Sequence, residues 1–553
     1  MKLHLTVLVA LTAAFLAAPL RAQVTSERIQ HALVEPQNWM TYSGTYNGQR
    51  YSLLKQVAAG NVSHLAVQWI FQTPVPGKFE ATPLVVDGVM YVTGAENHAY
   101  AVDARTGRTL WHYQRALPEK LRACCGHVNR GFAMNGDKLY MATLDAHVVA
   151  LHSKTGNVVW DTEAADYTKG HSFTVAPLAV KDKIIVGVSG GEFGVRGFID
   201  AYDTETGQRA WRFYTVAGPG EPGHESWAGD SWTRGGAPAW VTGTFDPELN
   251  LIYWPTGNPS PSNDGSERGG DNLYSNSVVA LDADTGKLKW HFQFTPHDLH
   301  DWDATEVPML LDLVIGGQTR KVLAQANRNG FFYVLDRSDG KFILGKRFAR
   351  QLTWAKGLDA NGRPIVLKES DPTEKGVRVC PGAIGATNFM SPSYSTQTGY
   401  FYVNAREQCD LFTVERQEYQ AGRAYLGSTY YPAANEKDWG ALRAIDPRTG
   451  EIKWEFKHFS APWAGTLATA GGLVFAGDIE GNLIAFDART GKALWHFQTG
   501  SAIYASPMTF SVDGRQYVAI AAGNALLTFA LPEEPGSSSP ASSPAKAPAK
   551  KNP

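Results

Sequence analysis

Alternating hydrophobic and polar positions recur along the chain in short stretches, the pattern of half-buried β-strands. In AVDARTGRTLWHY (101–113), one strand ends at an Asp, a Thr-Gly turn follows, and a second strand carries Trp with an aromatic residue two positions later. Segments of the same form recur at 150–162, 201–213, 280–292, 444–456 and 485–497, and a degenerate copy at 334–346 has Leu344 in place of Trp. The pattern predicts a repeat protein made of β-sheets.

Each repeat has room for more than the two strands around its Thr-Gly turn. The preceding segment PLVVDGVMYVTG (83–94) reads as two further strands joined by a glycine turn. Four antiparallel strands per repeat make a sheet that cannot bury both faces alone, whereas sheets arranged radially around an axis can. We therefore predict that the repeated tryptophans pack between neighbouring sheets.

The number of closing strands predicts the number of sheets. Counted at the tryptophan position, there are eight of them, at Trp69, Trp111, Trp160, Trp211, Trp290, Leu344, Trp454 and Trp495. This predicts an all-β fold, an eight-bladed β-propeller. The first closing strand, LAVQWIF (65–71), precedes every complete repeat, so we expect it to finish a blade whose other strands are C-terminal. The long intervals 212–279 and 345–443 are expected to hold inserted loops with binding or catalytic residues.

The two ends of the chain differ from the repeats. Residues 3–18 form an apolar run behind Lys2 that leads to small residues near Ala22, which predicts a signal peptide over 1–22, cleaved on export to the periplasm. An uncleaved membrane anchor is the alternative, but the run is short and contains His4. Residues 532–553 are rich in Pro, Ser, Ala and Lys and predict a disordered tail. The expected propeller spans 23–531, with no membrane span in the mature chain.

Composition narrows the class of protein. The 553 residues include 51 Lys+Arg and 53 Asp+Glu, a net charge of -2, which argues against nucleic-acid binding because that needs a basic surface. A hydrophobic content of 43% excludes a wholly disordered chain. The length alone would suggest three or four domains. Blades that share their burial with neighbours make one ring instead.

Adjacent cysteines are the first departure from the repeat. Cys124 and Cys125 stand in RACCGHVNRG, and the chain has only two others, Cys380 and Cys409. In an exported protein the adjacent pair could be two free thiols, two partners of distant cysteines, or a vicinal disulfide. Cys380 and Cys409 could pair with each other and leave the adjacent pair to bond. Counting leaves these alternatives open.

Four other breaks carry candidate chemistry: VSGGEFG (188–194), GGAPAW (235–240), PTGNPSP (255–261) and TPHDLHDWDATE (295–306). Any one of them could be only a hydrated loop. Their Asp, Glu and Asn side chains offer oxygen ligands, which suit calcium better than zinc. The sequence contains no CxxCH haem motif, no GxxxxGK[ST] phosphate loop and no serine-hydrolase elbow.

Together these motifs resemble the pyrroloquinoline quinone (PQQ)-dependent alcohol dehydrogenases, the family of methanol dehydrogenase large subunits and quinoprotein ethanol dehydrogenases. The resemblance runs from NWMTYSGTYNGQRYS (38–52) to the last blade. It implies a vicinal disulfide between Cys124 and Cys125. It also implies an enzyme that oxidises a small alcohol to an aldehyde or ketone with PQQ and a bound metal ion.

The resemblance further implies a cofactor site. The implied PQQ contacts are Glu80, Cys124, Cys125, Arg130, Thr174, Ser189, Gly190, Gly191, Trp240, Arg328, Asn388 and Trp463. Glu80, Arg130 and Thr174 would bind the polar rim of the quinone. Trp240 would stack on one face of the flat ring, with the vicinal disulfide against the other. Arg328 would touch the quinone oxygens, a position that some family members fill with Lys.

The implied metal ligands are Glu192, Asn258 and Asp301. Asp301 would also be the general base, and Arg328 would stabilise charge developing on the quinone oxygens. Asp303 lies two residues beyond Asp301, where lanthanide-using members carry an extra ligand and some calcium-dependent members lack a carboxylate. Other PQQ enzymes also have Asp there. We therefore expect Ca²⁺, with a lanthanide ion as the alternative.

Partners follow from what the chain lacks. Without a haem motif, electrons are expected to leave to a separate acceptor, a soluble cytochrome c, and a homodimer is possible. One competing reading is a non-catalytic propeller scaffold of the outer-membrane assembly type, which shares Trp-ended repeats. Such a scaffold has no need of the adjacent cysteines, Glu192 or the Asp-Trp-Asp segment. A second is a degenerate quinoprotein that has lost its cofactor.

Overall fold

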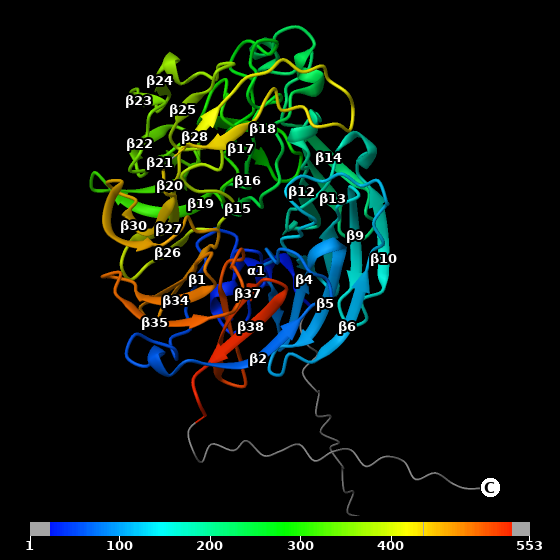
Figure 1. Cartoon of the computed structure of the whole chain (residues 1–553). Coiled ribbons are helices and arrows are strands. Elements are labelled where there is room, and N and C mark those ends of the chain that lie inside the picture. The colour runs from blue at the N-terminus through cyan, green and yellow to red at the C-terminus, as the bar shows by residue number, and fades with distance from the viewer. Residues whose placement is uncertain (1–22, 435, 534–553) are drawn as a thin grey trace, which may run out of the picture.

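Eight β-sheets of at least four strands follow one another around a central axis in the computed structural model (Figure 1). The structure describes residues 23–434 and 436–533. The eight-bladed β-propeller predicted from the repeats is confirmed. The predicted signal peptide, and the predicted tail beyond residue 533, lie outside the described residues.

The first five blades each take four consecutive strands of the chain. In a typical blade the third strand is buried along most of its length, whereas the outer strand buries alternate residues, because only its inner face meets the next blade. These strands are β3 (Leu84–Val86), β4 (Val89–Thr93), β5 (His98–Asp103) and β6 (Thr109–Gln114); β7 (Ala133–Asn135), β8 (Lys138–Ala142), β9 (His147–His152) and β10 (Val158–Glu163); β11 (Leu178–Val180), β12 (Lys183–Gly187), β13 (Phe198–Asp203) and β14 (Arg209–Tyr214); β15 (Thr244–Asp246), β16 (Leu251–Pro255), β17 (Ser277–Asp282) and β18 (Leu288–Gln293); β19 (Met309–Ile315), β20 (Gln318–Ala326), β21 (Phe331–Asp336) and β22 (Phe342–Arg347).

The last three blades depart from consecutive order. The sixth is interrupted by an insertion between its second and third strands, and the seventh gains β1 (Tyr51–Ser52) as a parallel edge strand. Their strands are β26 (Ser393–Ser395), β27 (Tyr400–Glu407), β30 (Trp439–Asp446) and β31 (Glu451–His458); β32 (Thr466–Thr469), β33 (Leu473–Gly477), β34 (Asn482–Asp487) and β35 (Ala493–Gln498); and, in the eighth blade, β36 (Met508–Val512), β37 (Arg515–Ala522), β38 (Ala525–Ala530) and β2 (Ala66–Gln72).

The ring closes where β2 pairs antiparallel with β38, with Ala66 opposite Ala530 and Gln72 opposite Ala525. Figure 1 shows this blade in both end colours of the chain, blue for β2 and red for β38. The prediction that the first closing strand completes a C-terminal blade is therefore confirmed. Pairing the two ends satisfies backbone groups that would otherwise be exposed at sheet edges.

Six of the repeated tryptophans join their blade to the next, as predicted. Trp111 donates its indole N–H to the carbonyl of Ser153 at 2.8 Å, and a Cβ atom at Gly156 would lie 2.8 Å from its ring. Gly156 also has a φ of 73°, so the Thr-Gly turn needs glycine for its backbone and for the close approach of the indole. Blades with the same hydrogen bond and the same ring-on-glycine contact are those of Trp69, Trp160, Trp211, Trp290 and Trp454.

Smaller elements lie in the insertions and at the N-terminus. Two accessory sheets comprise β23 (Ala355–Leu358) with β24 (Pro364–Val366), and β25 (Val377–Val379) with β28 (Asp410–Phe412) and β29 (Tyr430–Pro432). Helices within the described residues are short: α1 (Ser26–Gln30) and the 3₁₀ turns Ala32–Val34, Val62–His64, Ala95–Asn97, Tyr167–Lys169, Gly191–Phe193, His224–Ser226, Ser231–Arg234 and Lys368–Ser370. Across residues 23–434 and 436–533, no helix has the length and apolar character to cross a membrane.

Candidate functional site

Loops at one end of the ring surround a cavity of about 250 Å³. In an antiparallel four-stranded sheet, the segment before the first strand and the loop between the second and third strands lie at the same end. Most of the predicted site residues belong to such segments. Those that line the cavity are Glu80, Cys124, Cys125, Arg130, Thr174, Ser189, Gly190, Glu192, Trp240, Asp301, Asp303, Arg328, Asn388 and Trp463.

Two predicted residues, Gly191 and Asn258, are not among the residues that line the cavity. A Cβ atom at Gly191 would lie 2.8 Å from Pro238 and 3.7 Å from Oδ1 of Asn258. The backbone N–H of Ser189 donates to the carbonyl of Ser172 at 2.8 Å, and its hydroxyl lies 3.1 Å from that of Thr174. Close packing of the protein backbone is therefore sufficient to explain why glycine stands at positions 190 and 191, as would the approach of a ligand.

Glu80 and Arg130 form a buried ion pair in the wall. Nη2 of Arg130 donates to Oε2 of Glu80 at 2.7 Å. The guanidinium also lies 4.7 Å from the ring centre of Trp240 and 4.8 Å from that of Phe389. Burial raises the pKa of Glu80, and the charge of Arg130 opposes that shift. Nε of Arg130 is buried without a partner among the described residues, so the cation keeps a donor for an anionic ligand.

Asp303 connects the aromatic ring of Trp240 with the guanidinium of Arg328 through hydrogen bonds. Its Oδ2 accepts from the indole Nε1 of Trp240 at 2.8 Å and from Nη2 of Arg328 at 3.1 Å. Its Oδ1 accepts from the backbone N–H of Asn258 at 2.5 Å. Nη2 of Arg328 also donates to Oδ1 of Asn388 at 3.1 Å. One carboxylate thus positions a ring, a guanidinium and a candidate metal ligand.

The implied metal ligands present oxygen atoms in surroundings with too few cations. Both hydrogens of the Asn258 amide are directed to protein oxygens, those of Pro259 and Ser262 at 3.1 Å, which leaves Oδ1 as the ligand atom. Burial and the charge of Asp303 raise the pKa of Glu192 to about 7, and the same causes raise the pKa of Asp301. A hard cation would relieve this repulsion, and the donor set fits one.

The Cys124–Cys125 bond implied by the resemblance is present in the structure and lines the cavity. Cys380 and Cys409 also pair, so the two bonds use all four cysteines. The sulfur atoms of Cys124 and Cys125 and a carboxylate oxygen of Glu192 lie within 4.8 Å of one another. Because both sulfurs are in a disulfide, they are not thiolate ligands for a metal ion. They form instead a wall beside the oxygen donors.

The crowded segment 295–306 divides into two groups. Asp301 and Asp303 face the cavity, whereas Asp298 accepts from the backbone N–H groups of His300 and Trp302 at 3.0 and 2.8 Å. His300 is buried, its ring stacks on that of Trp302, and burial lowers its pKa to about 4. These residues hold the loop in shape, and the sequence alone did not separate the two groups.

Sequence reasoning missed ten residues of the cavity wall. They are Lys78, Val128, Ser262, Asn263, Ile384, Phe389, Leu426, Ser428, Thr429 and Tyr430. All but Lys78 and Val128 lie in the two insertions, which the long intervals between repeats did indicate. It also missed Arg406, whose guanidinium lies 4.3 Å from the ring centre of Trp463.

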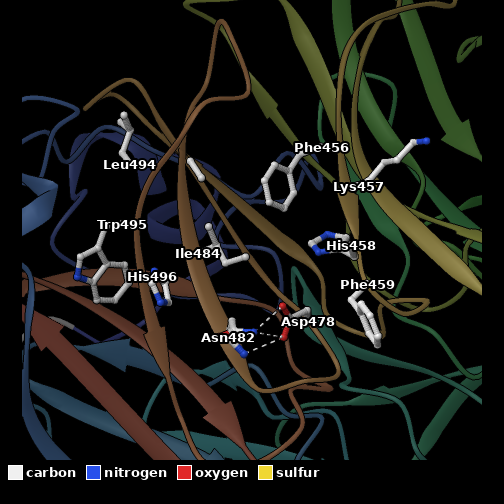
Figure 2. Close-up of a pocket in the computed structure, with 11 residues that line it drawn as sticks. Phe456, Lys457, His458, Phe459, Asp478, Asn482, Ile484, Leu494, Trp495 and His496 are labelled. Atoms are coloured by element: carbon white, nitrogen blue, oxygen red, sulfur yellow. Dashed lines mark hydrogen bonds between the residues drawn. The ribbon is translucent and has the colours of Figure 1, made fainter.

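A second hollow lies between β31 and β35 at the outer surface of the ring. It has a volume of about 440 Å³, and Figure 2 shows Asn482 bonding Asp478 on one side of it. Phe456, His458 and Trp495 are also among its lining residues. The described residues around it include none of the predicted site. The central cavity is therefore the candidate functional site.

Comparisons with known proteins point to one family. Residues 39–346 and 416–518 match the family described as "PQQ: Glucose/ethanol/alcohol dehydrogenase, beta-propeller domain". The quinoprotein alcohol dehydrogenase PedH of Pseudomonas putida is 44% identical over 541 residues, which cover 93% of this chain and 90% of that protein. The lanthanide-dependent methanol dehydrogenase of Methylacidiphilum fumariolicum is 38% identical over 522 residues, with coverages of 88% and 85%.

A solved structure gives the same relationship in three dimensions. The quinohemoprotein alcohol dehydrogenase ADHIIG from Pseudomonas putida HK5 superposes with a TM-score of 0.88 at 37% sequence identity. The match covers 96% of this chain and 85% of that one. The shared fold therefore extends over nearly the whole chain.

Proposed function

This chain belongs to the PQQ-dependent quinoprotein alcohol dehydrogenases and is an enzyme of that kind, and we propose that it oxidises a small alcohol in the central cavity with Asp301 as the general base. The observation that supports this assignment most is the convergence of Trp240, the vicinal disulfide, Arg328 and Asp301 on one cavity. No competing scaffold function explains why a buried carboxylate and a buried cation meet there.

The cavity fits the cofactor by its chemistry. Buried cations and hydroxyls face a flat aromatic wall, which suits a planar, polyanionic quinone. Glu80, Arg130 and Thr174 would bind its rim, and Trp240 and the Cys124–Cys125 bond would lie against its faces. PQQ, when bound, supplies the electron sink for the hydride taken from the alcohol.

The chain's own residues then supply orientation and proton transfer. Asp301 accepts the hydroxyl proton of the alcohol at its carboxylate. The guanidinium of Arg328, buried and held by Asp303, Asn388 and the backbone carbonyl of Asp301, stabilises negative charge that develops at the quinone oxygens. The burial of Asp303, Arg328 and Asn388 strengthens each electrostatic interaction among them.

The proposed metal ligands are Glu192, Asn258 and Asp301, with Asp303 as a possible fourth. Ca²⁺ and a trivalent lanthanide are both hard cations that prefer oxygen donors. The crowding of carboxylates in the cavity favours the higher charge, whereas in the structure both oxygens of Asp303 are already bonded by protein donors. Apoprotein reconstituted with PQQ and either Ca²⁺ or La³⁺ distinguishes the two. If Asp303→Ala keeps full lanthanide-dependent activity, Asp303 is not the extra ligand.

We further propose that residues 1–22 direct export to the periplasm and that a soluble cytochrome c accepts the electrons. The absence of a CxxCH motif from the sequence supports a separate acceptor. N-terminal sequencing of the exported protein tests the cleavage near Ala22. Reduction of purified cytochrome c by the loaded enzyme and ethanol tests the acceptor.

The deciding experiment is a dye-linked assay on protein loaded with PQQ and metal, together with its absorption spectrum. We expect a quinone band and ethanol-dependent dye reduction. Asp301→Asn should lower kcat by at least a hundredfold, because the base is lost while the side-chain shape is retained. Asp339→Asn makes the same change in an exposed turn and should leave the rate unchanged. A loaded protein without dye reduction on any short alcohol would remove the proposal.

A further inference from the structure

The accessory sheet of β25, β28 and β29 contributes the side chain of a tyrosine, Tyr430, to the lining of the candidate active site. Tyr430 is the first residue of β29, opposite Phe412 in β28, and their ring centres lie 6.1 Å apart. Its ring is half-buried, and it lines the central cavity together with Glu192, Asp301 and Arg328. The next residue, Tyr431, is 54% exposed and does not line the cavity.

The sheet is tied to the cavity wall at two points. Cys409, directly before β28, forms a disulfide with Cys380, directly after β25. Oδ2 of Asp410 accepts from the backbone N–H of Ala383 at 2.8 Å. The same segment, residues 380–389, includes Asn388, whose Oδ1 accepts a hydrogen bond from Arg328. The place of Tyr430 is therefore set by covalent and hydrogen-bonded links to the same wall that holds the cation.

The phenol of Tyr430 shares the cavity with Asp301, the proposed base. Burial raises the pKa of Tyr430 to about 12, the charges of Asp301, Asp410 and Glu192 add to the shift, and Arg328 opposes it. The phenol is accordingly protonated at neutral pH and is a donor. Within the described part of the chain its hydroxyl makes no hydrogen bond, so the donor is available to a ligand in the cavity that Tyr430 lines.

An alcohol in this space presents complementary groups. Its hydroxyl has one hydrogen to donate and two lone pairs to accept with. Asp301 takes the hydrogen, and a donor is needed at a lone pair to orient the oxygen. We propose that Tyr430 is a substrate-binding residue whose hydroxyl donates a hydrogen bond to the oxygen of the alcohol, an inference that rests on the proposed function of the cavity.

The test compares Tyr430→Phe with Tyr431→Phe in enzyme loaded with PQQ and metal. Both variants lose one phenol oxygen, but only the first loses it inside the cavity. For Tyr430→Phe we expect KM for ethanol to rise roughly five- to tenfold, because one hydrogen bond to bound substrate is lost. The kcat should stay within about twofold and the Kd for PQQ should be unchanged. Tyr431→Phe should match the wild type.

A second measurement separates this inference from turnover. 2-Methyl-2-propanol has no hydrogen on its carbinol carbon and is not oxidised, so its Kd for the loaded protein, measured by ligand-observed NMR, reports binding alone. The Kd should rise by the same factor in Tyr430→Phe. An unchanged KM and Kd in Tyr430→Phe, or an equal rise in Tyr431→Phe, overturns the proposal. Absence of dye reduction by the wild type would count against the proposed function, and the Kd comparison would still decide the role of Tyr430.

Discussion

The indole Nε1 of Trp240 donates a hydrogen bond of 2.8 Å to Oδ2 of Asp303, the same oxygen that accepts from Arg328. A residue considered from the sequence as a metal ligand is thus also the partner that orients the aromatic wall. The positions of the Trp240 ring and of the Arg328 guanidinium therefore depend on the same carboxylate, that of Asp303.

This coupling predicts the behaviour of Trp240→Phe, which keeps an aromatic face but loses the N–H donor. We expect the affinity for PQQ, measured by equilibrium dialysis, to fall by more than about tenfold, the size of one charge-assisted hydrogen bond. Combined with Asp303→Asn in a double-mutant cycle, the two changes should be coupled by about 1 kcal/mol. Strictly additive effects would show that the bond does not orient the ring.

The metal-free protein should lose stability as the pH rises. Glu192 has a pKa of about 7 in the folded chain, above its ordinary value of 4.5. Between these values the folded state binds more protons than the unfolded state. The contribution of the Glu192 carboxyl to the free energy of unfolding is therefore complete below pH 4.5 and is lost as the pH rises through 7. In the presence of a chelator, the free energy of urea unfolding should change with pH by about 1–3 kcal/mol less in Glu192→Gln than in the wild type. Parallel pH profiles would contradict this assignment.

Gly340→Ala should destabilise the ring because of the interblade contact. The new Cβ atom would lie 2.5 Å from the ring of Trp290, and the φ of 76° is unfavourable for alanine. We expect a loss of about 2–4 kcal/mol in free energy of unfolding. Gly514 has the same φ of 76° and open space around it, so Gly514→Ala should cost only the backbone term of about 1 kcal/mol. Equal losses in the two variants would refute interblade packing as the cause.

The two disulfides should have different effects on stability. Cys380–Cys409 closes a loop over a separation of 29 residues, so replacing both cysteines with Ala should cost about 2–4 kcal/mol in guanidinium unfolding. The same double change at Cys124 and Cys125, which closes no loop, should leave global stability nearly unchanged and weaken PQQ binding instead. A reversed order of stabilities would be inconsistent with this division of roles.

Arg406→Met should disturb the cofactor site although Arg406 does not line the cavity. Its guanidinium lies 4.3 Å from the ring centre of Trp463 and donates to the carbonyls of Ala461 and Pro462. We expect about tenfold weaker PQQ binding and a shift in tryptophan emission, because both the ring and its backbone lose their support. Arg406→Lys, which keeps the charge without the planar fork, should be intermediate. Unchanged PQQ binding in Arg406→Met would refute a positioning role.

The sequence was sufficient to predict the ring of blades because each repeat has the same local pattern of strands and turn. A strand ending in Asp, a Thr-Gly turn and a closing Trp are local features, and their spacing counts the blades before any contact is known. Even closure could be predicted, since the strand around Trp69 had no repeat of its own. The resemblance then placed Trp240, Asp301 and Arg328 in one site.

The side chains contributed by the insertions could not be predicted in the same way. Nothing periodic in residues 345–443 shows that Tyr430 faces the cavity while Tyr431 faces solvent, because that depends on how β29 pairs with β28 and on the Cys380–Cys409 link. The same holds for the division between Asp298 and Asp301.

The sequence by itself determined the all-β class, the eight blades, the closing strand and the family of the site, because these follow from local patterns repeated along the chain. Only the tertiary structure decided which carboxylates share the cavity, that Asp303 bonds both Trp240 and Arg328, and that Tyr430 lines the same cavity as Asp301. Those relationships join residues far apart in the chain. They depend on how the loops fold over the end of the ring, which local spacing does not specify.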